Sequence, residues 1–410
     1  MTFTVSVELN GTAIEDVTLE GVTIRYGRQT AYDQPDPTTC SIRLVRDSTL
    51  GTVNVNDVAI GSTLRVAVTP QGQTEQRRFF GIVTDVSADN ETVTIAGTAT
   101  GLYSMRQLTY IAPGYNVYDS NAADALAAAY VLALGAFIPD VNNKPSRFPD
   151  LYAEAYSGQY LNIAYKFNAL DELDLGTVMG DAAAATIGGV LRENMLKVAG
   201  KENIAVTLAS YKEREDLTAD VTLTSSEVTL TDWQAARELG SYATAQTVSY
   251  VGPYNYVAQD FDQPGEATRE SDLIDTFGPF TRSQSLPMTS GTEAAALCLF
   301  NITCTEWPGW LLDVTLPLAS MTAARQVTIC TNALVSKCWH TPSLATGLPT
   351  KWFCEGYTET ISRNDWVMAL RLSDTASSGV GQQWNQVTAG LIWNNVDATT
   401  RWVDLKNEDL

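Results

Sequence analysis

The chain contains a single histidine, His340, among its 410 residues. This scarcity excludes metalloprotease sites that need two histidines, and the sequence also lacks the H-E-x-x-H, G-x-S-x-G and P-loop motifs. A Cys–His dyad would have to join His340 to a distant thiol such as Cys40 or Cys298. A structural or surface histidine is the better interpretation, so the sequence predicts that the protein is not an enzyme.

Basic residues are also scarce. Lys and Arg total 26 against 47 Asp and Glu, which gives a net charge of −21 and a pI near 4.4. Such a protein repels nucleic-acid phosphates and anionic membranes, because binding by counterion release needs clustered cations. We therefore expect no sequence-specific DNA binding, although passage of DNA through a negatively charged pore would suit this charge.

Long apolar runs and a basic leader are missing. The first eight residues alternate like a β-strand, so no signal peptide is expected. The most apolar stretch, residues 122–138, contains Asp124 and is too short to cross a bilayer. The sequence therefore predicts no transmembrane segment.

The cysteines lack the spacing of a metal site. Beside Cys40, five fall in the last third of the chain: Cys298, Cys304, Cys330, Cys338 and Cys354. No pair has C-x-x-C spacing, and Cys338-Trp339-His340 is too cramped for a usual zinc pair. Buried free thiols are the favoured interpretation, with disulfides and a metal or iron–sulfur site as alternatives, and no cofactor is predicted.

Two distant segments resemble copies of one β-hairpin. Residues 80–90 lead into an alternating run at 92–95, and residues 356–365 lead into another at 366–370. Aligned at Gly81 and Gly356, the first segment's Val86 meets Ile361 of the second. Apolar residues alternate towards a polar turn and away from it in both, as in a strand-turn-strand unit. The similarity indicates two related β-units in one chain, although any two hairpins share glycines and Asx turns.

Elsewhere the periodicity varies along the chain. Short strands dominate residues 1–112, including 22–26, 40–45 and 64–68, and they predict a first tube-like antiparallel β-barrel. Residues 113–235 read as a mixed α/β domain whose end could complete that barrel, with helices expected at 122–134 and from 169 towards 185. Asp171, Glu172 and Asp174 are expected on a solvated face near the start of the second helix.

Residues 236–375 predict a second tube-like β-barrel that contains one helix. Ser290 and Glu293 form a capping box before the apolar residues 294–303. The fold class is thus mainly β with an α/β insertion.

Residues 376–410 predict a linker and a C-terminal arm with a tryptophan repeat. The tryptophans are nine residues apart, and each unit also carries a Val: Trp384 with Val387, Trp393 with Val396, and Trp402 with Val403. This spacing puts successive rings on opposite faces of a single strand or helix, so each Trp is expected to anchor a small unit of its own. Binding to a partner protein is favoured over a local flap on the chain's own surface.

In order, these features resemble the tail-hub, or baseplate-hub, family of bacteriophage minor tail proteins, especially those of long-tailed phages of actinobacteria. The matching stretches span essentially the whole chain: 24–28 with 41–44, 80–86, the helix at Glu293, 355–361 with Trp366, and the C-terminal Trp-Asn-x-Val units.

The resemblance implies a homotrimer whose two tube-like barrels per subunit form a pseudo-sixfold ring. Such a hub would sit at the tail tip of the virion after synthesis in the host cytoplasm. It would join the hexameric tail tube or distal tail ring to threefold tip, fibre or tape-measure proteins, and it would line the DNA exit channel.

Two other functions stay open. A carbohydrate-binding or receptor-binding tail-tip protein would expose aromatic residues such as Trp307 and Trp310 for sugar stacking. A cell-wall hydrolase is the third hypothesis, because the separation of two catalytic carboxylates is a property of the three-dimensional structure.

Overall fold

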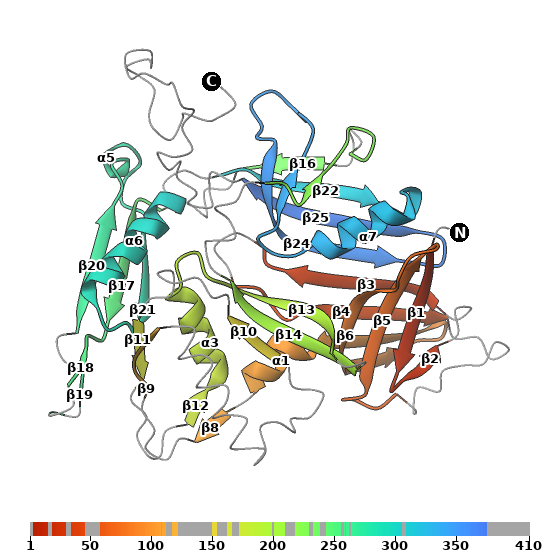
Figure 1. Ribbon diagram of the computed structural model, residues 1–410, viewed down its shortest axis with the longest axis horizontal. Coiled ribbons are helices and arrows are strands. Elements are labelled where there is room, and N and C mark those ends of the chain that lie inside the picture. The colour runs from red at the N-terminus through yellow and green to blue at the C-terminus, as the bar shows by residue number, and fades with distance from the viewer. Residues whose placement is uncertain are drawn as a thin grey trace.

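The computed structural model describes most of the chain (Figure 1). The described residues are 3–14, 19–29, 34–45, 58–107, 109–111, 117–121, 150–153, 162–165, 172–198, 201–209, 218–228, 233–237, 243–255, 258, 260–261, 264–305 and 309–374. The helix expected at 122–134, Trp307 and the whole C-terminal arm, with Trp384, Val387, Trp393, Val396 and Trp402, lie outside them.

One large sheet organises the molecule. It has 13 strands, and eleven follow the order β16-β22-β25-β24-β3-β4-β7-β6-β5-β1-β2. Their bounds are β1 Phe3–Leu9, β2 Thr12–Ile14, β3 Leu19–Gly27, β4 Thr39–Val45, β5 Thr63–Pro70, β6 Gln76–Ala88, β7 Thr92–Ala99, β16 Trp233–Ala236, β22 Leu311–Pro317, β24 Lys351–Ile361 and β25 Trp366–Asp374. The protein is therefore mainly β, as the alternating patterns predict.

Both predicted hairpins are present. β6 pairs with β7, and β24 pairs with β25, each antiparallel and each with a bulge in the first strand. Their turns close alike, since the N–H of Asp89 donates to the carbonyl of Thr92 at 3.0 Å and that of Ser362 to Asp365 at 2.8 Å. When the two hairpins are superposed by these turns, Asp89 matches Ser362, which is two residues away from the alignment based on Gly81 and Gly356. A shift of two residues along a strand leaves each side chain on the same face of the sheet.

The sheet contains one arrangement of four strands twice. Block A is β3-β4-β7-β6, and block B is β16-β22-β25-β24. In each block the first strand along the chain (β3 or β16) pairs with the second (β4 or β22). The second pairs with the last strand of the hairpin (β7 or β25), and the first strand of the hairpin (β6 or β24) forms the other edge; every pairing is antiparallel. The two blocks are joined edge to edge where β24 pairs with β3. This pairing, the β3–β24 seam, connects residues more than 300 positions apart.

The expected pair of closed barrels is not seen in the described residues. The strands form an open path from β16 to β2, and the two blocks share one hydrophobic cluster. Phe3 of β1 contacts Trp366 of β25, with ring centroids 5.3 Å apart. The β3–β24 seam explains why block B does not close on itself. Part of the outer edge of β24 pairs with β3, so block B extends the sheet of block A.

Helices and short strands cover the large sheet. α7 packs against β5, while β23 pairs with both β24 and β15. Their bounds are β15 Val221–Thr222, the 3-10 helix η5 Leu318–Ser320, α7 Ala323–Asn332 and β23 Cys338–His340. Thr322 caps α7, because its side-chain oxygen accepts the N–H of Arg325.

The inserted α/β region follows block A. Its elements are α1 Thr100–Gln107, β8 Thr109–Ile111, β9 Val117–Asn121, β10 Asp150–Ala153, β11 Asn162–Tyr165, β12 Glu172–Asp174, α3 Leu175–Ala184, β13 Val190–Val198 and β14 Lys201–Ala209. Buried Glu193 ties this region to block A, since its carboxylate accepts the N–H groups of Thr38 at 2.8 Å and Leu102 at 2.6 Å. The helix expected from residue 169 begins at Leu175 instead, so its predicted start was wrong: Glu172 and Asp174 lie in β12, paired with β8, and Asp171 lies outside the described residues.

A smaller sheet stands apart from the large one, at the left of Figure 1. β17 lies between β20 and β21, and α6 packs on β17 and β20. The bounds are β17 Ala245–Tyr250, β18 Tyr254–Asn255, β19 Asp260–Phe261, β20 Gly265–Glu270, α5 Ile274–Phe277, β21 Thr281–Leu286 and α6 Gly291–Thr305. The predicted cap of α6 is confirmed in part, because Ser290 Oγ accepts the N–H of Glu293 at 3.4 Å.

The predicted domain boundaries stay a prediction. β16 spans 233–236, across the boundary placed after residue 235, and its strand partner is β22. No helix among those described is both long and apolar enough to cross a membrane.

Candidate assembly surface

The β3–β24 seam depends on two glycines that face each other. Gly356 pairs with Gly27 in the register of the two strands. A Cβ on Gly356 would lie 2.3 Å from the carbonyl oxygen of Tyr26, and one on Gly27 would lie 2.3 Å from that of Glu355. Gly27 also has a φ of +90°, which favours glycine. Gly356 therefore makes its close contact inside the chain, and this contact sets how closely the two blocks approach.

A buried ion pair crosses the seam beside these glycines. Arg28 Nε lies 2.5 Å from Glu355 Oε2, and both side chains are almost fully buried. The hydroxyl of Ser373 donates to the other carboxylate oxygen, and the backbone N–H of Arg28 donates to the Glu355 carbonyl at 2.8 Å. Because a buried charge without a partner is costly, these contacts favour one alignment of the two blocks.

A second buried pair connects the hairpins of the two blocks. Arg78 of β6 contacts both carboxylate oxygens of Glu359 in β24, at 2.9 and 3.0 Å. The indole N–H of Trp366 donates to the same carboxylate at 2.6 Å, and Arg78 also donates to the carbonyl of Cys330 at 3.2 Å. Tyr357 lies under the guanidinium and stacks on Tyr26, with ring centroids 5.1 Å apart. This network fixes block A against block B from inside the core.

The opposite face of the sheet carries small hydroxylated side chains. In one row of neighbouring strands the outward residues are Ser41, Thr23 and Thr360, and in the next they are Thr39, Arg25, Thr358, Ala369 and Thr315. These positions are exposed or half-buried. We call this surface the hydroxyl face. It runs across both blocks and over the seam.

Several charges on the hydroxyl face are paired. Arg43 Nε lies 3.0 Å from Glu20, and Arg371 Nε lies 3.2 Å from Asp313. Each pair joins neighbouring strands, and both partners are substantially exposed. Pairing lowers the attraction of these guanidinium groups for a passing anion such as DNA phosphate.

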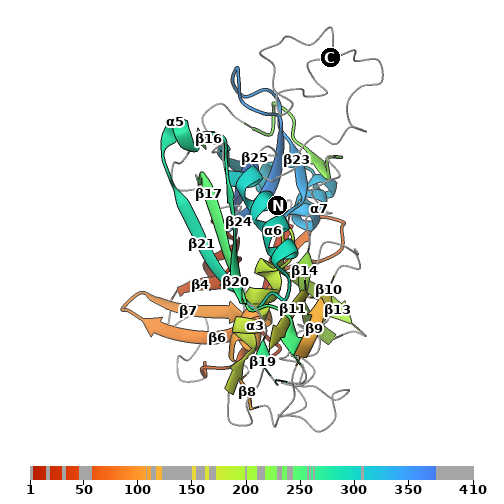
Figure 2. The ribbon, with the colours of Figure 1, turned by 90° about the vertical axis from the view of Figure 1, so that its left-hand side faces the viewer.

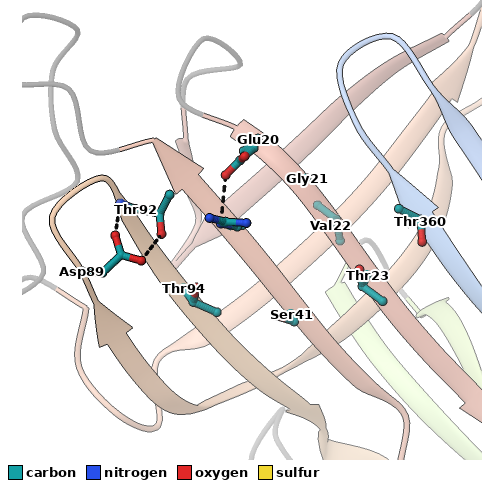
Figure 3. Close-up of a pocket in the computed structure, with 10 residues that line it drawn as sticks. Glu20, Gly21, Val22, Thr23, Ser41, Asp89, Thr92, Thr94 and Thr360 are labelled. Atoms are coloured by element: carbon teal, nitrogen blue, oxygen red, sulfur yellow. Dashed lines mark hydrogen bonds and ion pairs between the residues drawn. The ribbon is translucent and has the colours of Figure 1, made fainter.

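A shallow groove of about 420 Å³ lies where the hydroxyl face meets the β6–β7 turn (Figure 3). Its lining is polar: Glu20, Gly21, Val22, Thr23, Ser41, Arg43, Asp89, Thr92, Thr94 and Thr360. The Asp89 carboxylate accepts the N–H groups of Glu91 and Thr92, and these hydrogen bonds lower the pKa of Asp89. Asp89 thus holds the turn in shape, which is a structural role for this acid.

The remaining predicted hairpin residues lie in different environments. Gly81 faces β7, where an added Cβ would lie 2.2 Å from the carbonyl oxygen of Thr98. Ile361 is fully buried opposite Val22 at the seam. Val86 is half-buried near the tip of β6. The structure therefore brings Gly356 and Ile361 together at the seam, with Gly81 and Val86 in the other hairpin.

All six cysteines are buried and unpaired by disulfides. Burial raises the pKa of the Cys330 thiol to about 12, and it also raises those of Cys40 and Cys354. Such thiols are protonated near neutral pH and are poor nucleophiles and poor metal ligands. Within the described ranges no three His, Cys, Asp or Glu side chains gather as a metal site. Trp310, considered for sugar stacking, is half-buried and has the Arg237 guanidinium 4.5 Å from its ring centroid.

Sequence reasoning did not identify the seam charges. Glu355 and Glu359 lie in a run of otherwise apolar and small residues that reads as an ordinary strand, and both are fully buried. One signal in the sequence is the spacing of the two acids. Glu355 and Glu359 are four residues apart, which places both on one face of a strand, whereas Thr358 and Thr360 lie on the other, exposed face. Arg78 follows Arg77 near the start of β6, and such a basic pair has no functional signature by itself.

Comparisons with known proteins give the fold. No family model and no curated protein sequence matches the chain. The 43 kDa tail protein of prophage MuSo2 from Shewanella oneidensis is similar in structure, with a TM-score of 0.57, 11% identity, and coverage of 92% of this chain and 99% of that one. The tail protein from Neisseria meningitidis MC58 is also similar in structure. Its TM-score is 0.58 and its sequence identity 12%, and the match covers 93% of this chain and 99% of that one. The chain therefore shares, over nearly its whole length, the fold of two solved tail proteins.

Proposed function

We propose that this chain is a structural protein of a bacteriophage tail and forms its tail-tip hub. The observation that carries the proposal is the likeness in fold to two tail proteins over 92–93% of the chain. Its identity to them is only 11–12%, so the likeness supports the fold directly and the function through it.

The duplicated blocks support the hub role. A chain with two similar β-units can occupy two neighbouring positions of a ring, so three chains would fill six positions. A homotrimer would then match a hexameric tail tube on one side and threefold tip, fibre or tape-measure proteins on the other. In this proposal the blocks take the part that the two predicted tube-like barrels were expected to play.

The hydroxyl face fits the wall of a DNA channel. Its outward residues are mostly Thr and Ser, and of its arginines, Arg25, Arg43 and Arg371, the last two are paired with acids, which weakens their hold on phosphate. The chain as a whole carries a net charge of −21, which repels DNA and keeps such a wall from adhering to it. We propose that this face is turned towards the channel and that the protein has no catalytic role.

Native mass spectrometry of the purified chain tests the hub. We expect a species of three chains, each of 44.5 kDa. A strict monomer at every concentration would contradict the trimer and favour a monomeric binding module. Release of muropeptides from cell walls by the purified chain would contradict the proposal that it is not an enzyme.

A further inference from the structure

The β3–β24 seam shows how one four-strand block joins the next. Block B offers the outer strand of its hairpin, β24, and block A accepts it with its first strand, β3. The equivalent strands left over are β6, the outer hairpin strand of block A, and β16, the first strand of block B. In the described residues β16 pairs with β22 alone.

β6 is divided in the same way as β24. The first half of β24, from Lys351 to Phe353, pairs with β23, and its second half pairs with β3. The first half of β6, from Gln76 to Ile82, pairs with β5, and Val83 bonds to Ser62 and Gly61. Beyond Val83, the described partner of β6 is β7 alone. Figure 2 shows this end of the β6–β7 hairpin projecting away from the rest of the molecule.

We infer that the free end of β6, residues 84–88, pairs with β16 of a second copy of this chain, as β24 pairs with β3 within one copy. This inference rests on the proposed ring and names its chain-to-chain contact. The contact is head-to-tail, because different strands meet, so it can propagate from copy to copy until the ring closes.

The duplicated arrangement also fixes the register. When the two turns are superposed, Val86 takes the place of Glu359, and Trp233, which pairs with Val314, takes the place of Ile24, which pairs with Cys40. Since Glu359 pairs with Ile24 at the seam, Val86 would pair with Trp233. Asp85 would then lie opposite Gln234, while Thr84 is the bulged residue of β6 and has no equivalent in β24.

The side chains agree with this register. Val86 and Trp233 are both half-buried and both pack against the hydrophobic core, as the core-facing pair of the new seam must. Asp85 and Gln234 are both exposed, like Thr358 and Arg25 at the internal seam. A register shifted by one residue would set an apolar side chain against a polar one on each face.

Trp233 gives an independent indication of a missing neighbour. Its indole nitrogen is buried, and it has no hydrogen-bond acceptor in the described part of the chain. Buried indole N–H groups normally find a partner. A strand laid along β16 would bring backbone carbonyls to this edge.

The new seam differs from the internal one in strength. Neither residues 84–88 nor β16 contains a glycine, and the described edges contain no ion pair equivalent to Arg28 with Glu355. The contact between copies would therefore form without the buried charges that fix the two blocks of one chain. Copies can then meet and separate while each chain stays folded.

Disulfide trapping tests the pairing. Directly opposite residues of antiparallel strands have Cα atoms about 4.5–5.5 Å apart, within the range of about 4.4–6.8 Å that a disulfide spans. The double variant Asp85→Cys with Gln234→Cys should cross-link into covalent trimers on mild oxidation. Because the native cysteines are buried, they should not interfere. The single variants should stay uncross-linked, since a head-to-tail contact never brings a residue against its own copy.

The matched control is Ser87→Cys with Gln234→Cys, on the same face but two residues out of register, which should cross-link at least tenfold less. A native trimer without cross-linking of the Asp85 pair would overturn the strand pairing and leave the hub proposal standing. A monomer without cross-linking would overturn both. Equal cross-linking of the single variants or of the control would also overturn the pairing, because it would show random collision.

Discussion

At the scale of single residues, the seam combines two features that ordinary sheet edges lack. Gly27 and Gly356 let two backbones approach, and buried Glu355 and Glu359 each have an arginine partner. Buried ion pairs add little net stability compared with apolar packing, but breaking one leaves an uncompensated charge. The seam charges therefore select one arrangement of the blocks more than they strengthen it.

Replacing Glu355 tests this role. The variant Glu355→Gln keeps the size of the side chain and leaves Arg28 buried without its counter-charge, so we expect a loss of about 3–5 kcal/mol in the free energy of unfolding. Urea denaturation followed by circular dichroism measures it. The control is Glu20→Gln at the exposed pair with Arg43, where the loss should be below about 1 kcal/mol. Equal losses would show that burial of the seam pair has no special effect.

The two glycines predict a fold defect, not an assembly defect. In Gly356→Ala the new Cβ would meet the Tyr26 carbonyl at 2.3 Å, so we expect a lower unfolding temperature of the single chain. The control is Gly180→Ala in α3, where nothing lies within 4 Å and alanine should stabilise the helix by about 0.5–1 kcal/mol. If Gly356→Ala kept its melting temperature but lost self-association, this glycine would belong to a subunit contact instead.

At the scale of elements, hairpins were predictable and long-range pairings were not. The β6–β7 and β24–β25 hairpins follow from local alternation and polar turns, which the sequence shows directly. The pairing of β24 with β3 joins residues more than 300 positions apart, and no local pattern encodes it. Glu172 and Asp174 were misassigned for the same reason, because β12 forms only through its partner β8.

The candidate surface was predictable only in part. Gly81, Val86, Gly356 and Ile361 were recognised as hairpin residues, but which hairpin edge is joined and which is free depends on the whole sheet. The hydroxyl face was hidden because single Thr residues in strands have no functional signature. It becomes visible when the register sets residues from several strands in rows.

At the scale of the whole molecule, one chain presents two four-strand blocks in a single sheet with one shared core. Joining two units covalently halves the number of contacts that must form between chains in a ring of six positions. It also lets two positions of the ring differ, as a junction between sixfold and threefold parts requires. The small sheet with α6 is inserted in block B between β16 and β22 and is one such difference.

The C-terminal arm, outside the described residues, makes a prediction at this scale. Deletion of residues 382–410 should leave the described sheets folded and impair joining to tip or fibre proteins, because the Trp384, Trp393 and Trp402 units are expected to bind a neighbour. Circular dichroism and co-purification with tail-tip proteins measure the two effects. Precipitation of the shortened chain would show that the arm covers its own hydrophobic surface.

We propose that three chains present six similar blocks around one channel. Cryo-electron microscopy of the purified oligomer tests it most directly. We expect a ring that looks sixfold at low resolution and threefold at high resolution, with Thr23, Ser41 and Thr360 facing the lumen. A ring with another number of chains, or a trimer whose hydroxyl faces point outward, would contradict it.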